Sequence, residues 1–234
     1  KKRMRSCALL ILTSLMAAAT ALRIGKLAPP STCFMLCDIQ DRFRPIIHSG
    51  ESVVSTANFL LRVASTLGCP TVATEQYPKA FGNTCEDVLA LRGEDGKASG
   101  KMTLPTFEKK LFSMLTPEVS SHLRSITPSE PTSYILFGIE AHVCVQQTCL
   151  DLLDLGHDVH VVVDGVSSIS PLDREIALER MRQSGAFLTT AQSVAFMLMK
   201  DAGHPNFKQV SKMVVEHGKV QNDFHDLARK RSAL

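Results

Sequence analysis

Three kinds of reactive side chain come soon after segments that are predicted to be buried strands. Asp38 follows one apolar run, and Lys109 and Lys110 follow a weaker one. Cys144 comes after a third run, where a helical pattern begins. Because parallel strands bring their carboxyl ends to one edge of a sheet, these groups are expected to meet there.

A cysteine, a carboxylate and a lysine at one sheet edge would suffice for acyl transfer through a thioester. A helix N-terminus lowers the pKa of a thiol from about 8.5 toward physiological pH. The carboxylate can take the thiol's proton, the lysine can stabilise negative charge, and N–H groups at the helix start can bind an oxyanion. By itself the pattern has little specificity, because a cysteine in an apolar helix start is more often part of a core.

An alternation of strand-like and helix-like segments must position these residues. Predicted strands cover residues 32–37, 71–74, 101–105, 133–138, 157–163 and 187–189, and predicted helices cover residues 51–67, 143–155, 171–184 and 191–200. Residues 78–100 are predicted to be a loop. This order predicts one doubly wound, three-layer α/β/α domain around a central six-stranded parallel sheet.

Local signals mark the ends of several predicted helices. Gly68 stands where the first residue after a helix is expected. Ser170 is a predicted N-cap, with Pro171 in the first helical position. Thr189 and Gln192 form a predicted capping box for the helix at residues 191–200.

Composition and charge exclude several classes of protein. The chain has 234 residues, of which 44% are hydrophobic and 21% charged, as in a globular protein. Residues 1–31 hold six of the 26 basic residues and none of the 23 acidic ones, so the remainder has 20 basic against 23 acidic residues. Such a body offers no broad cationic face, which disfavours nucleic-acid binding. The seven cysteines, an odd number without a CxxC pair, indicate a reducing compartment, and we predict a cytoplasmic protein.

Residues 1–22 form a predicted leader. Basic residues precede an apolar run that ends in small residues, which is typical of a secretory signal and also compatible with an organelle transit peptide. A third interpretation is an untranslated extension upstream of Met4 or Met16. A genuine leader would make a mitochondrial location an alternative to the cytoplasm.

Several segments resemble the isochorismatase-like cysteine hydrolases, and most closely the isochorismatase-domain-containing proteins of eukaryotes. The similarity is carried by residues 34–45, 74–79, 109–114, 138–148, 161–168, 177–181 and 204–208. It extends in order over residues 23–217, which we predict to be the hydrolase domain, followed by a basic tail at residues 218–234.

The resemblance implies a catalytic triad of Asp38, Lys109 and Cys144. Lys110 fits the family pattern less well than Lys109. The family also implies a cis peptide bond between Ile139 and Glu140, which would turn the Glu140 N–H alongside the Cys144 N–H to form an oxyanion hole. In this interpretation, the substrate pocket is lined by three further side chains, Phe43, Tyr77 and His142.

The resemblance also bears on metals and on the reaction. Related nicotinamidases hold a metal with an Asp-x-His motif after the second strand, whereas residues 74–77 contain no histidine, so we predict no metal and no cofactor. Isochorismatases proper lack the nucleophilic cysteine, so Cys144 favours cleavage of a small amide or ester. The alternatives are a catalytically silent binding or scaffold protein and a metal-dependent amidase. We predict a small-molecule substrate and no membrane association; a homo-oligomer is left open.

Overall fold

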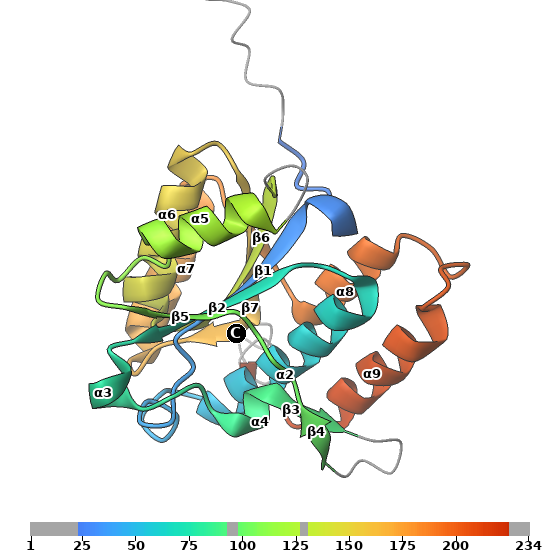
Figure 1. The fold of residues 1–234 in the computed structure, drawn as a ribbon, viewed down its shortest axis with the longest axis horizontal. Helices are drawn as coiled ribbons and strands as arrows, with labels where there is room; N and C mark the ends of the chain where they lie inside the picture. The colour runs from blue at the N-terminus through green and yellow to red at the C-terminus, as the bar shows by residue number, and fades with distance from the viewer. Residues whose placement is uncertain (1–22, 93–97, 127–130, 225–234) are drawn as a thin grey trace, which may run out of the picture.

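A parallel sheet of six strands lies at the centre of the computed structural model, which describes residues 23–92, 98–126 and 131–224 (Figure 1). Its strand order is β5-β2-β1-β6-β7-β8. The strands are β1 Thr32–Cys37, β2 Thr71–Gln76, β5 Thr106–Lys109, β6 Ser133–Ile139, β7 Asp158–Ser167 and β8 Phe187–Thr189. All neighbouring strands pair in parallel, which confirms the predicted sheet.

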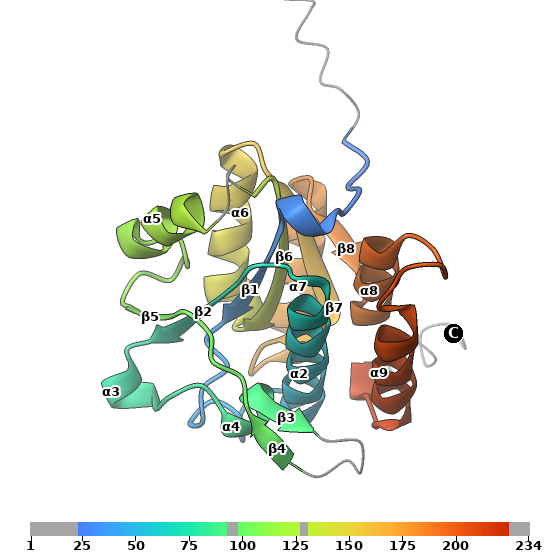
Figure 2. The same ribbon diagram turned by 45° about the vertical axis from the view of Figure 1, so that its right-hand side comes forward.

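Helices cover both faces of the sheet. One layer contains α2 (Gly50–Leu67), α8 (Ala191–Met199) and α9 (Phe207–Lys219), and α2 contacts both of the others. The opposite layer contains α5 (Pro117–Ser125), α6 (Gln146–Asp154) and α7 (Pro171–Gln183), as Figures 1 and 2 show from two directions. The predicted three-layer α/β/α fold is therefore confirmed.

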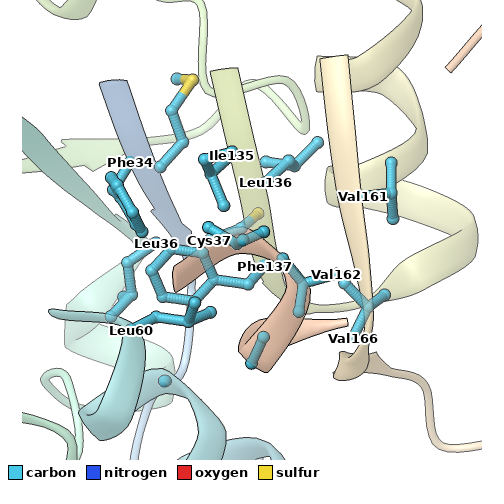
Figure 3. Packing of buried hydrophobic residues seen from close by; sticks show 14 of the residues in the cluster. Phe34, Leu36, Cys37, Leu60, Ile135, Leu136, Phe137, Val161, Val162 and Val166 are labelled. Atoms are coloured by element: carbon cyan, nitrogen blue, oxygen red, sulfur yellow. The ribbon is translucent and has the colours of Figure 1, made fainter. Parts of the chain in front are cut away.

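The centre of the core lies where β1 and β6 pair. Every residue of both strands is buried, as expected for strands that helices cover on both faces. Phe34 of β1 meets Phe137 of β6 edge to face, with 6.4 Å between the ring centroids (Figure 3). Leu60 of α2 is buried in the same cluster. Burial of each such side chain contributes about 2 kcal/mol to folding.

Most of the predicted helix ends are correct. Gly68 adopts the left-handed conformation after α2, with φ of 68°. The hydroxyl of Ser170 accepts a hydrogen bond from the N–H of Asp173 at the start of α7. The capping box at Thr189 is wrong, because Thr189 still pairs in β8 and Thr190 caps α8 instead.

The segment before β5 differs from the prediction. The described residues of the predicted loop contain α3 (Pro78–Phe81), α4 (Glu86–Leu89) and an antiparallel pair of strands, β3 (Ala90–Arg92) and β4 (Ala98–Lys101). The edge strand of the main sheet is Thr106–Lys109 rather than residues 101–105. The Ala73 N–H donates to the carbonyl of Pro105, the residue before β5. Lys109 pairs with Gln76 of β2 and is the last residue of β5.

Helices α5 and α9 differ from the predicted pattern. Helix α5 was not predicted from the sequence, because its buried side chains are Val119 and Leu123 alone, too few to produce a clear periodic signal. Helix α9 continues through residue 217, the predicted end of the domain. Beyond it, the ring centroid of Phe224 lies 4.2 Å from the guanidinium carbon of Arg174. The domain limits stay a prediction, and the predicted leader lies outside the described residues.

Within the described residues, none of the helices combines the length and the apolar character that a membrane span requires.

Candidate active site

A buried ion pair lies at the carboxyl edge of the sheet. The ammonium Nζ of Lys109 is 2.7 Å from Oδ2 of Asp38, and the two side chains are 0% and 2% exposed. Asp38 directly follows β1, whereas Lys109 ends β5, on the far side of β2. The long lysine side chain therefore reaches past the end of β2. Each charge compensates the other, since either one alone would be costly to bury.

The ammonium of Lys109 is held by four acceptors. Besides Asp38, it donates to Oε1 of Gln76 at 2.7 Å and to the carbonyls of Leu111 and Phe112 at 3.1 and 2.9 Å. These partners surround the group on several sides and leave it little freedom to turn. The positive charge is therefore fixed in position.

Burial acts to lower the pKa of Lys109, but its acidic neighbours act in the opposite direction. The nearby groups of Cys37, Asp38 and Cys144 together outweigh the burial, and the pKa of Lys109 lies above its ordinary value. Lys109 therefore stays an ammonium ion at physiological pH.

The carboxylate of Asp38 is oriented by two more donors. The hydroxyl of Thr74 donates to Oδ1 at 2.8 Å, and the thiol of Cys37 donates to Oδ2 at 3.6 Å. The backbone of Asp38 is left-handed, with φ of 52°, a conformation that non-glycine residues seldom adopt. Such strain persists only where surrounding contacts enforce it, and it is concentrated at functional sites.

Cys144 lies in a π-helical turn, η2 (Ala141–Val145), that leads directly into α6. It is 6% exposed, and its carbonyl accepts a hydrogen bond from the Thr148 hydroxyl at 2.6 Å. Its thiol interacts with the Cys37 thiol and electrostatically with Lys109. The fold thus brings Asp38, Lys109 and Cys144 into one cluster, although they are far apart in the sequence.

The cis peptide bond predicted between Ile139 and Glu140 is wrong: this bond is trans, as are the others in the described residues. A non-proline cis bond costs about 3–4 kcal/mol, and the chain turns here by other means. Gly138 has φ of 132°, and η2 begins three residues later, at Ala141. The oxyanion hole was predicted from the cis bond, which would turn the Glu140 N–H alongside the Cys144 N–H. Without that bond, an oxyanion hole formed by these two N–H groups stays a prediction.

Glycine is required at position 138 for a second reason. A Cβ atom there would lie 2.1 Å from the carbonyl oxygen of Cys37, its partner in the β1–β6 register. The end of β6 therefore packs directly against the end of β1. The turn that carries Cys144 begins three residues after Gly138.

The three predicted pocket residues follow β1, β2 and β6. Phe43 stacks on Phe81 with 4.6 Å between the ring centroids, and Tyr77 is exposed beneath the ammonium of Lys110 at 5.8 Å. The side chain of His142 is 37% exposed. All three therefore lie in segments at the carboxyl edge, and their role in binding substrate stays a prediction.

The ring of His142 is fixed by two polar neighbours. Its Nδ1 lies 3.0 Å from the Ser168 hydroxyl and 3.5 Å from Oε2 of Glu140. Burial raises the pKa of Glu140, although the Ile169 N–H and His142 act in the opposite direction. In a Ser–His–Asp triad, the two ring nitrogens of the histidine bind different partners. Here Ser168 and Glu140 both contact Nδ1 of His142, so these three residues do not form such a triad.

Two polar residues that hold the cluster were not predicted from the sequence. Gln76 accepts from Lys109 and donates to the carbonyl of Lys110 at 3.0 Å. Gln40 binds the backbone of Gln76 on both sides, accepting from its N–H at 2.8 Å and donating to its carbonyl at 3.1 Å. Their position at the ends of buried strands is the signal that could have identified them.

No group of three histidine, cysteine, aspartate or glutamate side chains gathers to hold a metal ion in the part of the chain that the structure describes. Glu75, at the end of β2, accepts instead from the N–H and hydroxyl of Thr84 at 2.6 and 2.8 Å.

The doubly wound sheet and the carboxylate–ammonium–thiol cluster at its carboxyl edge are those of an α/β protein of the isochorismatase-like hydrolase class. Residues 32–193 match the Isochorismatase domain. The secreted isochorismatase effector Isc1 of Phytophthora sojae is 45% identical over 207 residues, which are 88% of this chain and 95% of the relative. The chain therefore belongs to the isochorismatase family, which confirms the resemblance.

Solved structures agree with this assignment. The MAR1 ribonuclease from Caenorhabditis elegans has a TM-score of 0.72 and 38% identity, over 81% of this chain and 92% of that chain. The YcaC gene product of Escherichia coli, an octameric hydrolase of unknown specificity, has a TM-score of 0.68 over 92% of this chain and 99% of that chain. It is 19% identical, so this second likeness concerns the fold alone.

Proposed function

We propose that this protein is a cysteine hydrolase that cleaves a small amide or ester through a thioester on Cys144. The observation that carries the proposal is the buried Asp38–Lys109 pair, 2.7 Å apart, in one cluster with the Cys144 thiol. Such a cluster supplies a base, a fixed positive charge and a nucleophile. It also excludes most water, which strengthens each electrostatic interaction.

The proposed reaction has two stages. Asp38 takes the proton of Cys144, and the thiolate attacks the carbonyl carbon of the substrate. Lys109 stabilises the negative charge, assisted in this proposal by the N–H groups of Glu140 and Cys144. Asp38 then gives its proton to the leaving amine or alcohol, and a water molecule hydrolyses the thioester and frees the thiol.

The burial of the cluster supports a small substrate. Cys144 is 6% exposed and its two partners are nearly inaccessible, so a narrow, planar acyl group fits this approach better than a bulky one. We further propose that Phe43, Tyr77 and His142 line the entrance. The mechanism uses no metal or cofactor, because the Asp-x-His motif is missing from residues 74–77. A cytoplasmic location is also part of the proposal.

The experiment is a screen of small amides and esters with wild type and Cys144→Ser. Loss of the nucleophile is expected to lower turnover at least about a thousandfold. Cys149→Ser, five residues later on α6, is the matched control and should retain turnover. Substrate turnover by Cys144→Ser at the wild-type rate would overturn the assignment.

Two further measurements separate the alternatives. A limiting alkylating reagent should label Cys144 before the other cysteines, and prior labelling of another cysteine would contradict the proposal. A single-stranded RNA oligomer belongs in the panel because the C. elegans relative is called a ribonuclease. RNA cleavage that persists in Cys144→Ser would indicate a different function from the one proposed.

A further inference from the structure

A second buried thiol, Cys37, touches the cluster and has no task in the proposed reaction. It is the last residue of β1 and is fully buried. Its sulfur lies 3.6 Å from Oδ2 of Asp38, the oxygen that also binds Lys109. It also interacts with the thiol of Cys144. Two free thiols therefore lie together beside one carboxylate and one ammonium group.

The backbone explains why these two cysteines meet. Cys37 pairs with Gly138 in the β1–β6 register, and the absence of a side chain at Gly138 lets the two strand ends approach closely. The turn η2, which contains Cys144, begins at Ala141, three residues after Gly138. Cys37 therefore lies at the carboxyl end of a central strand of the sheet rather than in an exposed loop.

We propose that Cys37 and Cys144 form a reversible disulfide when a hydroperoxide oxidises Cys144. This inference rests on the proposed function in one respect, that Cys144 is the reactive thiol. A disulfide needs the two sulfurs to come within about 2 Å. In this proposal, rotation of the two side chains about their Cα–Cβ bonds brings the sulfurs to that distance.

The chemistry balances in two steps. The Cys144 thiolate attacks one peroxide oxygen, the O–O bond breaks, and the products are a sulfenic acid and an alcohol, or water when the oxidant is hydrogen peroxide. The Cys37 sulfur then attacks the Cys144 sulfur and displaces the hydroxyl group, which leaves as water with the Cys37 proton. The two thiols together lose two hydrogen atoms, and the peroxide is reduced.

The surroundings assign different roles to the two sulfurs. Lys109 lies beside both, but burial and the interaction with Cys144 raise the pKa of Cys37 well above its ordinary value. Cys37 therefore stays protonated and acts as the resolving cysteine, while Cys144 reacts with the peroxide first. The disulfide withdraws the nucleophile from catalysis and protects it from irreversible oxidation to sulfinic acid.

The test treats the reduced full chain with hydrogen peroxide, counts free thiols and maps disulfide-linked peptides by mass spectrometry. The count is expected to fall by two from seven, with Cys37 linked to Cys144, and dithiothreitol should restore both thiols. Cys37→Ala should instead accumulate sulfinic acid at Cys144 that dithiothreitol does not reverse. Cys33→Ala, another buried cysteine of β1, is the matched control and should behave as wild type.

Oxidation of wild type to sulfinic acid at Cys144 with Cys37 unchanged, or a link from Cys144 to another cysteine, would overturn the inference. The peptide map of wild type decides this even if a variant fails to fold. Rapid alkylation of Cys144 without any disulfide leaves the proposed hydrolase intact and rejects the switch. A Cys37–Cys144 disulfide in a protein that cleaves no amide or ester supports the switch and rejects the hydrolase.

Discussion

The ammonium of Lys109 and the carboxylate of Asp38 form a 2.7 Å ion pair whose members are 71 residues apart and almost completely buried. Two opposite charges in such a place depend on each other. A buried charge that loses its partner is not solvated by water, so the pair is sensitive to the removal of either side chain.

Lys109→Met should therefore lower the free energy of unfolding by about 3–5 kcal/mol. Methionine keeps much of the volume of the lysine but leaves Asp38 without its cation. Urea denaturation followed by circular dichroism measures the change. The control is Lys101→Met, because the ion pair of Lys101 with Glu86 is exposed, at 3.5 Å, and should contribute less than about 1 kcal/mol. Equal losses in the two variants would contradict the importance of burial.

Gln76→Leu should leave the ammonium of Lys109 less firmly held in place without removing its charge. The variant loses the 2.7 Å hydrogen bond to the ammonium, and a hydrogen bond to a charged group contributes about 1.5–3 kcal/mol to stability. We expect that loss in urea denaturation, together with slower alkylation of Cys144. Gln209→Leu, which removes an exposed 3.4 Å contact with Thr66, provides the comparison. Unchanged alkylation in Gln76→Leu would show that Gln76 does not position the cluster.

Gly138→Ala should destabilise the protein strongly. The new Cβ would lie 2.1 Å from the Cys37 carbonyl oxygen, and φ of 132° is unfavourable for alanine as well. The loss should exceed about 3 kcal/mol because backbone strain and steric overlap add. Gly156→Ala separates the two effects, since Gly156 has φ of 87° but no atom within 4 Å of an added Cβ. A loss of about 1 kcal/mol is expected there from the left-handed backbone alone, measured as the change in thermal midpoint, and equal shifts would contradict the steric argument.

His160 should make the protein less stable in acid. Burial, only partly opposed by Asp158, lowers the pKa of His160 from 6.5 to about 4. Its Nε2 has no hydrogen-bond partner among the described residues, and its ring stacks on Phe187. Below pH 6.5 the unfolded chain binds a proton that the folded chain does not, so the folded state loses stability as the pH falls.

This loss should grow until the pH reaches about 4 and amount to about 3 kcal/mol there, at 1.36 kcal/mol for each unit of pKa difference. Urea denaturation of wild type and His160→Gln between pH 7 and pH 4 measures it. The variant should show a shallower decline, because glutamine does not titrate. Parallel pH profiles would show that His160 is protonated in the folded protein.

Much of the sheet could be predicted from the sequence, for local reasons. Strand β1 and strand β8 have the predicted limits, because short apolar runs bounded by turn residues are a strong local signal. Strand β5 was misplaced, since only four residues pair at this edge and their mixed polarity resembles a loop. The buried face of α5 was too small to be recognised.

The candidate site was predictable only in part. Asp38 and Cys144 follow strong strands, so their place at the carboxyl edge could be inferred from chain order. The trans bond between Ile139 and Glu140 and the support that Gln76 gives to Lys109 could not. Each depends on which strand ends meet in space, and the sequence carries no periodic signal for that.

By itself, the sequence determined the alternation of strands and helices and the reactive residues that follow them, because hydrophobic periodicity and capping act over a few neighbouring residues. The tertiary structure alone decided that β5 lies beside β2, that Oδ2 of Asp38 binds the ammonium of Lys109 at 2.7 Å, and that Gln76 holds the same ammonium. These relationships arise from the packing of distant segments, where shape and burial select partners that no local pattern specifies.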